Sequence, residues 1–227
     1  MAWTPLESNP EIMNKYLHKL GVPEKWNMVD VYGLDSESLA WVSRPVLSVI
    51  LLFPCTDQYY EYRDKQAAEI KASGQSISPD VFYMKQVVPN ACGTVALIHS
   101  VANSNDAIQL GDGHLKQFLD DCKTMSPDDR GDFLQKADNI INAHKEIAQE
   151  GQTEAPDPDC PVNHHFVAFV HVDGNLYELD GRKEFPINHG PTTQDNLIED
   201  AAKVCKDYIA RQPDDVAFTV VALTNAD

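Results

Sequence analysis

The feature that most constrains this chain is a pair of strand-like runs joined by a two-residue turn. The runs are HHFVAFVHV and NLYELD, and Asp173-Gly174 lies between them. An Asp-Gly pair between runs rich in β-branched and aromatic residues favours the type I′ turn of a tight β-hairpin. The sequence therefore predicts antiparallel strands over 165–172 and 175–180. Because these strands are so apolar, we expect a layer of helices to cover the sheet.

The rest of the chain alternates between strand patterns and helix patterns. The run at 46–53 is short, almost wholly apolar and followed by Pro54, which is typical of a strand buried on both faces. Residues 10–20 carry an apolar helical face that ends at Gly21. Neither a repeat nor a Ser/Gly linker divides the chain, so we expect one domain over 1–227. Further helices are predicted at 57–72, 91–104, 113–123, 127–149 with a break, and 194–211, and a further strand at 216–223.

The net charge of the chain limits the kinds of molecule that it can bind. The chain has 18 Lys and Arg against 35 Asp and Glu, a formal net charge of −17, which repels phosphate backbones and anionic lipid headgroups. We therefore expect neither nucleic acid nor a membrane surface as a partner. The start of the chain lacks the basic and apolar regions of a signal peptide, and no run approaches the ~20 apolar residues of a membrane span. A cytoplasmic protein is expected.

One cysteine has a setting that suits catalysis. The chain has five cysteines, an odd number, and no Cys-x-x-Cys pair, which favours free thiols over a zinc site or a redox centre. Asn90, an expected N-cap, places Cys92 in the first turn of an apolar helix, where the positive helix end favours the thiolate. Gly93 would let a substrate backbone approach closely. The alternative for Cys92 is a small buried core residue. The remaining cysteines are expected to be structural or merely exposed: Cys55, Cys122, Cys205 and Cys160.

Gln86 adds a second chemical group to this segment. It precedes Cys92 by six residues. This spacing resembles papain-like sites, in which a glutamine amide and the cysteine N–H hold the oxyanion that develops during acyl transfer. The alternative is a solvent-facing amide before a loop.

The hairpin offers a base and an orienting acid for a thiolate. With a two-residue turn, Asp180 opposes Val167, and its diagonal neighbour on the same sheet face is His165, at roughly 7–8 Å between Cα atoms. His164 points to the opposite face. The alternative is that these residues only occupy a strand edge and a turn. His171 shares the His165 face, but no third ligand follows at a standard spacing, so no metal is expected.

Three segments carry a resemblance to a known family. QVVPNACGTVALIHSV, HHFVAFVHVDGNLYELDGR and FPINHG resemble the ubiquitin carboxyl-terminal hydrolases, the peptidase C12 type of cysteine peptidase. The similarity runs over nearly the whole chain and is closest to the short L-type isozymes without a carboxyl-terminal extension. Matched by motif, Cys92 falls at the family's nucleophile, His165 at its general acid/base, Asp180 at the acid that orients His165, and Gln86 at its oxyanion-hole glutamine.

The resemblance implies a fold and an activity. The fold is α/β, an antiparallel β-sheet flanked by helices on both sides, with a papain-like core, a knotted backbone and a crossover loop at roughly 147–162. The implied protein is a monomeric deubiquitinating thiol hydrolase without cofactors, which removes small or unfolded adducts from the terminal glycine of ubiquitin. The adducts are esters, thioesters, amides and peptide extensions. Two alternatives stay open: a module that sequesters ubiquitin and cuts slowly, or an enzyme that prefers a ubiquitin-like modifier.

Overall fold

A single antiparallel sheet forms the centre of the molecule. The computed structural model describes residues 2–151, 162–212 and 215–225. In that part of the chain the strands are β1 (Trp26–Asp30), β2 (Val46–Pro54), β3 (His164–Val172), β4 (Asn175–Leu179), β5 (Ile187–Pro191) and β6 (Thr219–Asn225). Their order across the sheet is β1-β6-β2-β3-β4-β5, and every neighbouring pair is antiparallel. The antiparallel sheet predicted from the sequence is confirmed.

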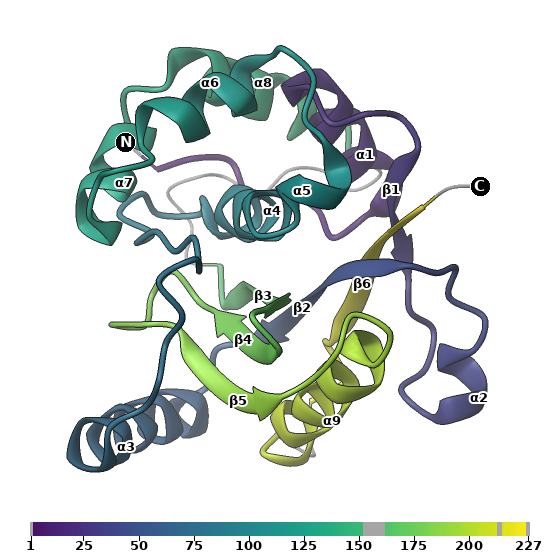
Figure 1. Ribbon diagram of the computed structural model, residues 1–227, viewed down its shortest axis with the longest axis vertical. Coiled ribbons are helices and arrows are strands. Elements are labelled where there is room, and N and C mark those ends of the chain that lie inside the picture. Colours follow the sequence, from purple (N-terminus) through teal and green to yellow (C-terminus); the bar gives the residue numbers. More distant parts are fainter. Residues whose placement is uncertain (1, 152–161, 213–214, 226–227) are drawn as a thin grey trace.

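Helices cover both faces of this sheet. They are α1 (Pro10–Leu20), α2 (Ser36–Leu39), α3 (Asp57–Ser73), α4 (Cys92–Ala102), α5 (Asn105–Ile108), α6 (His114–Asp121), α7 (Pro127–Leu134), α8 (Asp138–Ile147) and α9 (Leu197–Ala210). In Figure 1, α1 and α4 to α8 lie on one side of the sheet, and α3 and α9 lie on the other. This is the expected α/β arrangement, with helices on both sides.

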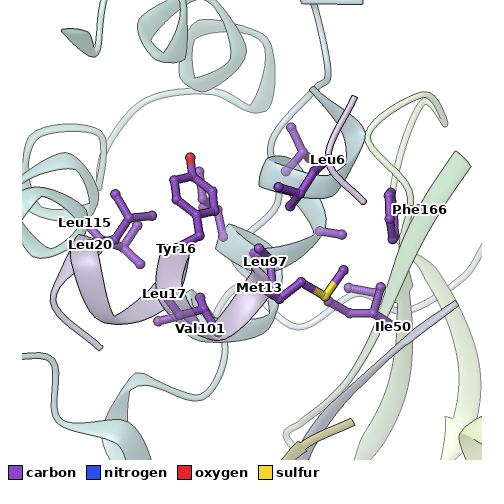
Figure 2. Packing of buried hydrophobic residues seen from close by; sticks show 14 of the residues in the cluster. Leu6, Met13, Tyr16, Leu17, Leu20, Ile50, Leu97, Val101, Leu115 and Phe166 are labelled. Carbon is purple, nitrogen blue, oxygen red and sulfur yellow. The ribbon is translucent and has the colours of Figure 1, made fainter. Parts of the chain in front are cut away.

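Strand alternation divides the apolar residues between two cores. Phe166 and Val170 of β3 pack in the core that contains α1 and α4, whereas Val167 and Phe169 pack in the core that contains α9. Because both faces of the central strands are covered, β2 is apolar and buried along nearly its whole length. Figure 2 shows side chains of the first core, from α1, α4 and the strands: Met13, Leu17, Leu20, Leu97, Val101, Ile50 and Phe166.

The hairpin has the predicted turn and register. Asp173 and Gly174 have φ of 47° and 76°, the two positive values that a type I′ turn requires. Val172 pairs with Asn175, and the ladder continues to Ala168 and Leu179. The side-chain faces inferred for this hairpin therefore hold in the structure.

The predicted helices form, but Asn90 does not cap the helix that follows it. α4 begins at Cys92, and its N-cap is Ala91, which makes no side-chain capping hydrogen bond. Asn90 has φ of 64°, a left-handed conformation, and its side-chain Nδ2 donates to the carbonyl oxygen of Trp3 at 3.0 Å. The N-cap prediction for Asn90 was wrong because an N-cap needs extended backbone, whereas here the chain turns sharply one residue earlier.

The elements that the sequence did not predict are short. They are β1, α2, α5 and β5. β5 contains Gly190 and Pro191, residues that argue against a strand unless it lies at a sheet edge, and β5 is an edge strand. Elements of four or five residues carry too little periodicity to be recognised without their neighbours.

Some expectations fall on residues outside the described part of the chain. Most of the expected crossover loop, including Cys160, lies at 152–161 and is among them. The knotted backbone and the single-domain organisation stay predictions. Among the helices of the described residues, none combines the length and the hydropathy that crossing a lipid bilayer requires.

Candidate active site

Cys92 is the first residue of a helix that is buried almost throughout. The cysteine is 8% exposed, and α4 packs against β3. A Cβ on the neighbouring Gly93 would lie 3.0 Å from Cβ of Leu6 and 3.4 Å from a ring carbon of Phe166. The space beside Gly93 is therefore taken by the protein's own amino-terminal segment. The expectation that Gly93 admits a substrate backbone was wrong, and this glycine instead lets that segment pack closely on α4.

His165 and Asp180 meet as the hairpin register predicts. Nε2 of His165 lies 2.6 Å from Oδ1 of Asp180, and both side chains are fully buried. Nδ1, the other ring nitrogen, is buried without a nitrogen or oxygen partner among the described residues. The Cys92 thiol interacts with this imidazole. Cys92, His165 and Asp180 thus form one connected set.

The three groups come from opposite sides of the sheet. His165 shares its strand face with Val167 and Phe169, which pack in the core that contains α9, whereas Cys92 belongs to the core that contains α4. His165 pairs with Phe53 in the last pair but one of the ladder between β2 and β3. The site therefore lies where these strands end, since only there do groups from the two faces meet.

The Asp180 carboxylate is held by further donors. Oδ1 also accepts the backbone N–H of Arg182 at 2.8 Å, and Oδ2 accepts the hydroxyl of Tyr59 at 2.7 Å. Tyr59 lies in the first turn of α3 and is 2% exposed. Tyr59 was not predicted from the sequence, because nothing in the pattern of α3 links it to the hairpin. The available signal was a group of three tyrosines, Tyr59, Tyr60 and Tyr62, near the start of a mostly polar helix.

These contacts shift the pKa values of all three groups. Burial alone would lower the pKa of His165, but the neighbouring Asp180 charge raises it to about 9. Burial alone would raise the pKa of the Cys92 thiol, but the His165 imidazole outweighs it, so that this pKa falls below its ordinary value. Burial also opposes ionisation of Asp180, yet the charge and hydrogen bonds of His165 hold its pKa far below the usual range. The lowered pKa of Cys92 and the raised pKa of His165 both favour a Cys92 thiolate paired with a His165 imidazolium.

Gln86 lies against the turn that carries Asp180. Its backbone N–H donates to the carbonyl oxygen of Gly181 at 2.9 Å, and its side-chain Nε2 donates to the carbonyl oxygen of Val88 at 3.0 Å. Oε1 of Gln86 is buried and has no hydrogen-bond partner among the described residues. A Cβ on Gly181 would lie 2.9 Å from Cβ of Gln86, so only glycine permits this approach. Gln86 is half-buried, and these contacts hold its amide against the protein.

A cavity of about 190 Å³ leads to Cys92. Its lining is mainly apolar and comes from the amino-terminal segment, the start of α4 and the start of β3, including Leu6, Asn90, Phe166 and His164. Gly151 and Val162, the two residues that flank the undescribed segment 152–161, also line it.

The other described cysteines lack this activation. Burial raises the pKa of Cys55 and that of Cys122 to about 11, and it raises the pKa of Cys205 as well. Across 2–151, 162–212 and 215–225, no three His, Cys, Asp or Glu side chains are arranged to hold a metal ion. Of the thiols in this part of the chain, that of Cys92 has its pKa lowered, whereas those of Cys55, Cys122 and Cys205 have theirs raised.

Comparisons with known proteins identify relatives over the full chain. The sequence model described as ubiquitin carboxyl-terminal hydrolase, family 1, matches residues 3–210. A ubiquitin carboxyl-terminal hydrolase of Drosophila melanogaster is 51% identical over 226 residues, which cover 100% of this chain and 99% of that protein. The human ubiquitin carboxyl-terminal hydrolase isozyme L1 is 48% identical over 227 residues and all of both chains. The catalytic domain of Trichinella spiralis UCH37, in a crystal structure with ubiquitin vinyl methyl ester, superposes with a TM-score of 0.78 at 25% identity, covering 100% of this chain and 97% of that one.

The ion pair predicts how the reactivity of Cys92 depends on pH. The rate of its alkylation by iodoacetamide should rise at a lower pH than the rate for a free thiol, because the His165 imidazolium stabilises the thiolate. This stabilisation is lost only when the imidazolium is deprotonated, with a pKa of about 9. His165→Gln should move the titration up to or beyond the free-thiol range. His164→Gln is the matched control and should leave it unchanged. Rates measured by mass spectrometry from pH 4 to 10 check this, and equal titration of both variants would contradict the ion pair.

Proposed function

The chain belongs to family 1 of the ubiquitin carboxyl-terminal hydrolases, and on this premise we propose that Cys92 is the nucleophile with which it hydrolyses adducts at the carboxyl-terminal glycine of ubiquitin. The observation that carries the assignment is the buried set of Cys92, His165 and Asp180, in which the 2.6 Å contact between His165 and Asp180 leaves the second ring nitrogen for the thiol. Nucleophile, base and orienting acid have the geometry of thiol catalysis.

The reaction has two halves. The Cys92 thiolate attacks the carbonyl carbon of the terminal glycine, and the His165 imidazolium donates its proton to the leaving amine, alcohol or thiol as that bond breaks. The product is a thioester between Cys92 and ubiquitin. Neutral His165 then takes a proton from water, the resulting hydroxide attacks the thioester carbonyl, and free ubiquitin leaves with the thiolate restored. Asp180 keeps the imidazole oriented and stabilises its charge in both halves.

The oxyanion of each tetrahedral intermediate needs donors. We assign them to the backbone N–H of Cys92, at the positive start of α4, and to the Gln86 amide. The Nε2 of Gln86 has two hydrogens, and the carbonyl oxygen of Val88 takes one. That hydrogen bond and the packing against Gly181 hold the amide in place, which is what preorganised stabilisation requires.

The choice between ubiquitin and a ubiquitin-like modifier, and between an enzyme and a slow sequestering protein, is open to one assay. The same carboxyl-terminal fluorogenic amide is made on ubiquitin and on a ubiquitin-like modifier, and kcat/KM is measured for both. We expect repeated turnover on ubiquitin and a much lower value on the other modifier. A single stoichiometric burst without turnover would instead indicate sequestration.

Replacing the nucleophile separates chemistry from binding. Cys92→Ser should abolish hydrolysis and leave ubiquitin affinity nearly unchanged, because the hydroxyl removes nucleophilicity with little change in volume. A ubiquitin vinyl methyl ester probe should label wild type at Cys92, as mass spectrometry of peptides would show. Cys55→Ser, the control, should still be labelled at Cys92. Labelling at Cys55, Cys122 or Cys205 in the Cys92→Ser variant would overturn the assignment.

Gly181 provides a test of Gln86 that leaves the amide group itself intact. Gly181→Ala places a methyl group 2.9 Å from Cβ of Gln86 and should displace the Gln86 side chain. We expect kcat to fall by about tenfold or more, approaching the roughly 10²- to 10³-fold loss that follows removal of an oxyanion-hole donor. Gly111→Ala is the control, because its nearest neighbour would lie at an ordinary 3.7 Å. If Gln86 mediates the effect, adding Gln86→Ala to Gly181→Ala should cost little more, whereas fully additive losses would refute this role.

Tyr59 should matter for kcat rather than for substrate affinity. Tyr59→Phe removes a hydrogen-bond donor from the buried Asp180 carboxylate, which orients His165. The loss of that hydrogen bond should cost about 1–3 kcal/mol. If the whole cost falls on the transition state, kcat drops roughly 5- to 150-fold while KM changes little. Tyr208→Phe is a matched control, since Tyr208 donates to another buried carboxylate, that of Glu178, at 2.8 Å. The control should lower the melting temperature similarly but keep kcat. Equal kcat in the two variants would show that Tyr59 is only structural.

A further inference from the structure

A second cavity is lined in part by residues that closely follow Asp180 in the chain. It has a volume of about 390 Å³ and lies between α3 and the segment that joins β4 to β5. Its lining includes Arg63 and Lys71 from α3, and Arg182 and Lys183 from the joining segment. These four cations outnumber the two acids of the lining, Asp64 and Glu184, in a chain whose formal net charge is −17.

One end of this cavity is tied to the catalytic groups. Arg182 follows Asp180 by two residues, and its backbone N–H donates to the Asp180 carboxylate at 2.8 Å. The Arg182 guanidinium lies 3.7 Å from Sγ of Cys55. Cys55 directly follows β2, the strand in which Phe53 pairs with His165. Through Arg182, the cavity is therefore connected to the carboxylate that orients the imidazole.

The cations of this cavity differ in how far they are neutralised. Lys183 is buried and pairs with Glu178, and Lys71 pairs with Glu184 at 2.6 Å. Arg63 pairs only with its own neighbour Asp64, whose side chain is 70% exposed. Within the described ranges, Arg182 has no carboxylate in ion-pair distance. A half-buried guanidinium without a counterion can bind an anion through its N–H donors and its charge.

The reaction determines which part of a substrate reaches this cavity. The acyl half must occupy the cavity that Cys92 lines, because the thiolate attacks its carbonyl carbon. The leaving atom must lie beside His165, because it receives the imidazolium proton. A group attached to the leaving atom is therefore within range of the Arg182 charge, which already helps to lower the pKa of the Cys92 thiol.

We propose that this cavity is a leaving-group site for carboxylates, in which Arg182, assisted by Arg63, binds an acidic group carried by the adduct that ubiquitin loses. The inference rests on the proposed function and adds a preference within it. A guanidinium offers paired N–H donors that match a carboxylate, and the negative field of the rest of the protein would otherwise disfavour an acidic leaving group. The carboxylate has two sources: an Asp or Glu side chain soon after the scissile bond, or the free terminal carboxylate of a short adduct.

The experiment compares paired substrates, so that general effects on the nucleophile cancel. Ubiquitin is extended at its carboxyl terminus by Glu-Glu-amide or Gln-Gln-amide, and kcat/KM is measured for each at low ionic strength. Wild type should prefer the acidic extension by about three- to tenfold, and the preference should fall with added salt. A third extension, Gln-Gln with a free carboxylate, tests the second source. A preference for it over its amide would extend the site to terminal carboxylates, and no preference would restrict it to side chains.

Arginine variants test which side chains cause the preference for the acidic extension. Arg182→Gln should bring the ratio of the two rates to about one, and Arg63→Gln should reduce it partly. Arg44→Gln, the control, removes an exposed arginine that pairs with Glu199 of α9 and should keep the wild-type ratio. If Arg182→Gln folds poorly by circular dichroism, Arg63→Gln together with the salt dependence in wild type decides the question.

The outcomes separate the two proposals. A wild-type ratio near one, or a preference that survives in both Arg182→Gln and Arg63→Gln, overturns the leaving-group site while the proposed hydrolysis stands. Failure of wild type to cleave either extension or the fluorogenic amide overturns the proposed function, and the leaving-group site with it.

Discussion

The buried carboxylate of Asp180 is the group on which the rest of the site depends. A carboxylate without water stays ionised in a protein only where hydrogen-bond donors and positive charge replace its hydration. Here the donors come from three separate parts of the chain: the His165 ring on β3, the Tyr59 hydroxyl on α3 and the Arg182 backbone N–H after β4. Because leaving this charge unpaired would be costly, Asp180 constrains how α3 sits against the hairpin as well as how the imidazole is oriented.

A second buried carboxylate, two residues earlier on the same face of β4, extends this arrangement. Glu178 pairs with Lys183 and His189 and accepts the hydroxyl of Tyr208, so it links the β4–β5 segment, β5 and α9. Its pKa, which burial alone would raise, is lowered to about 2 mainly by the Lys183 charge. Lys183 also helps to lower the pKa of Asp180. The catalytic groups and the cationic cavity are thus parts of one polar network beneath α3 and α9, and this network leaves Arg182 as the cation available for an anion.

Local patterns were sufficient wherever neighbouring residues decide the outcome. The Asp173-Gly174 turn sets the register of the hairpin, and the register alone places His165 and Asp180 on one face, since side chains alternate along a strand. The apolar run after Cys92 similarly predicted a buried helix with the thiol in its first turn. The same reasoning failed at Asn90 and Gly93, because contacts with the distant amino-terminal segment, through Trp3 and Leu6, determine both positions.

By itself, the sequence determined the antiparallel hairpin, the pairing of His165 with Asp180 and the position of Cys92 at a helix start, because turn geometry, strand alternation and helix periodicity act over a few residues. Three features instead depend on tertiary packing: Cys92 meets His165 from the opposite side of the sheet, Tyr59 supports Asp180 across 121 residues of sequence, and Arg182 joins the turn after Asp180 to a cavity with four cationic side chains. Such contacts depend on how helices pack on a sheet, which is governed by the summed burial and pairing of many distant side chains and leaves no periodic signal at any one position.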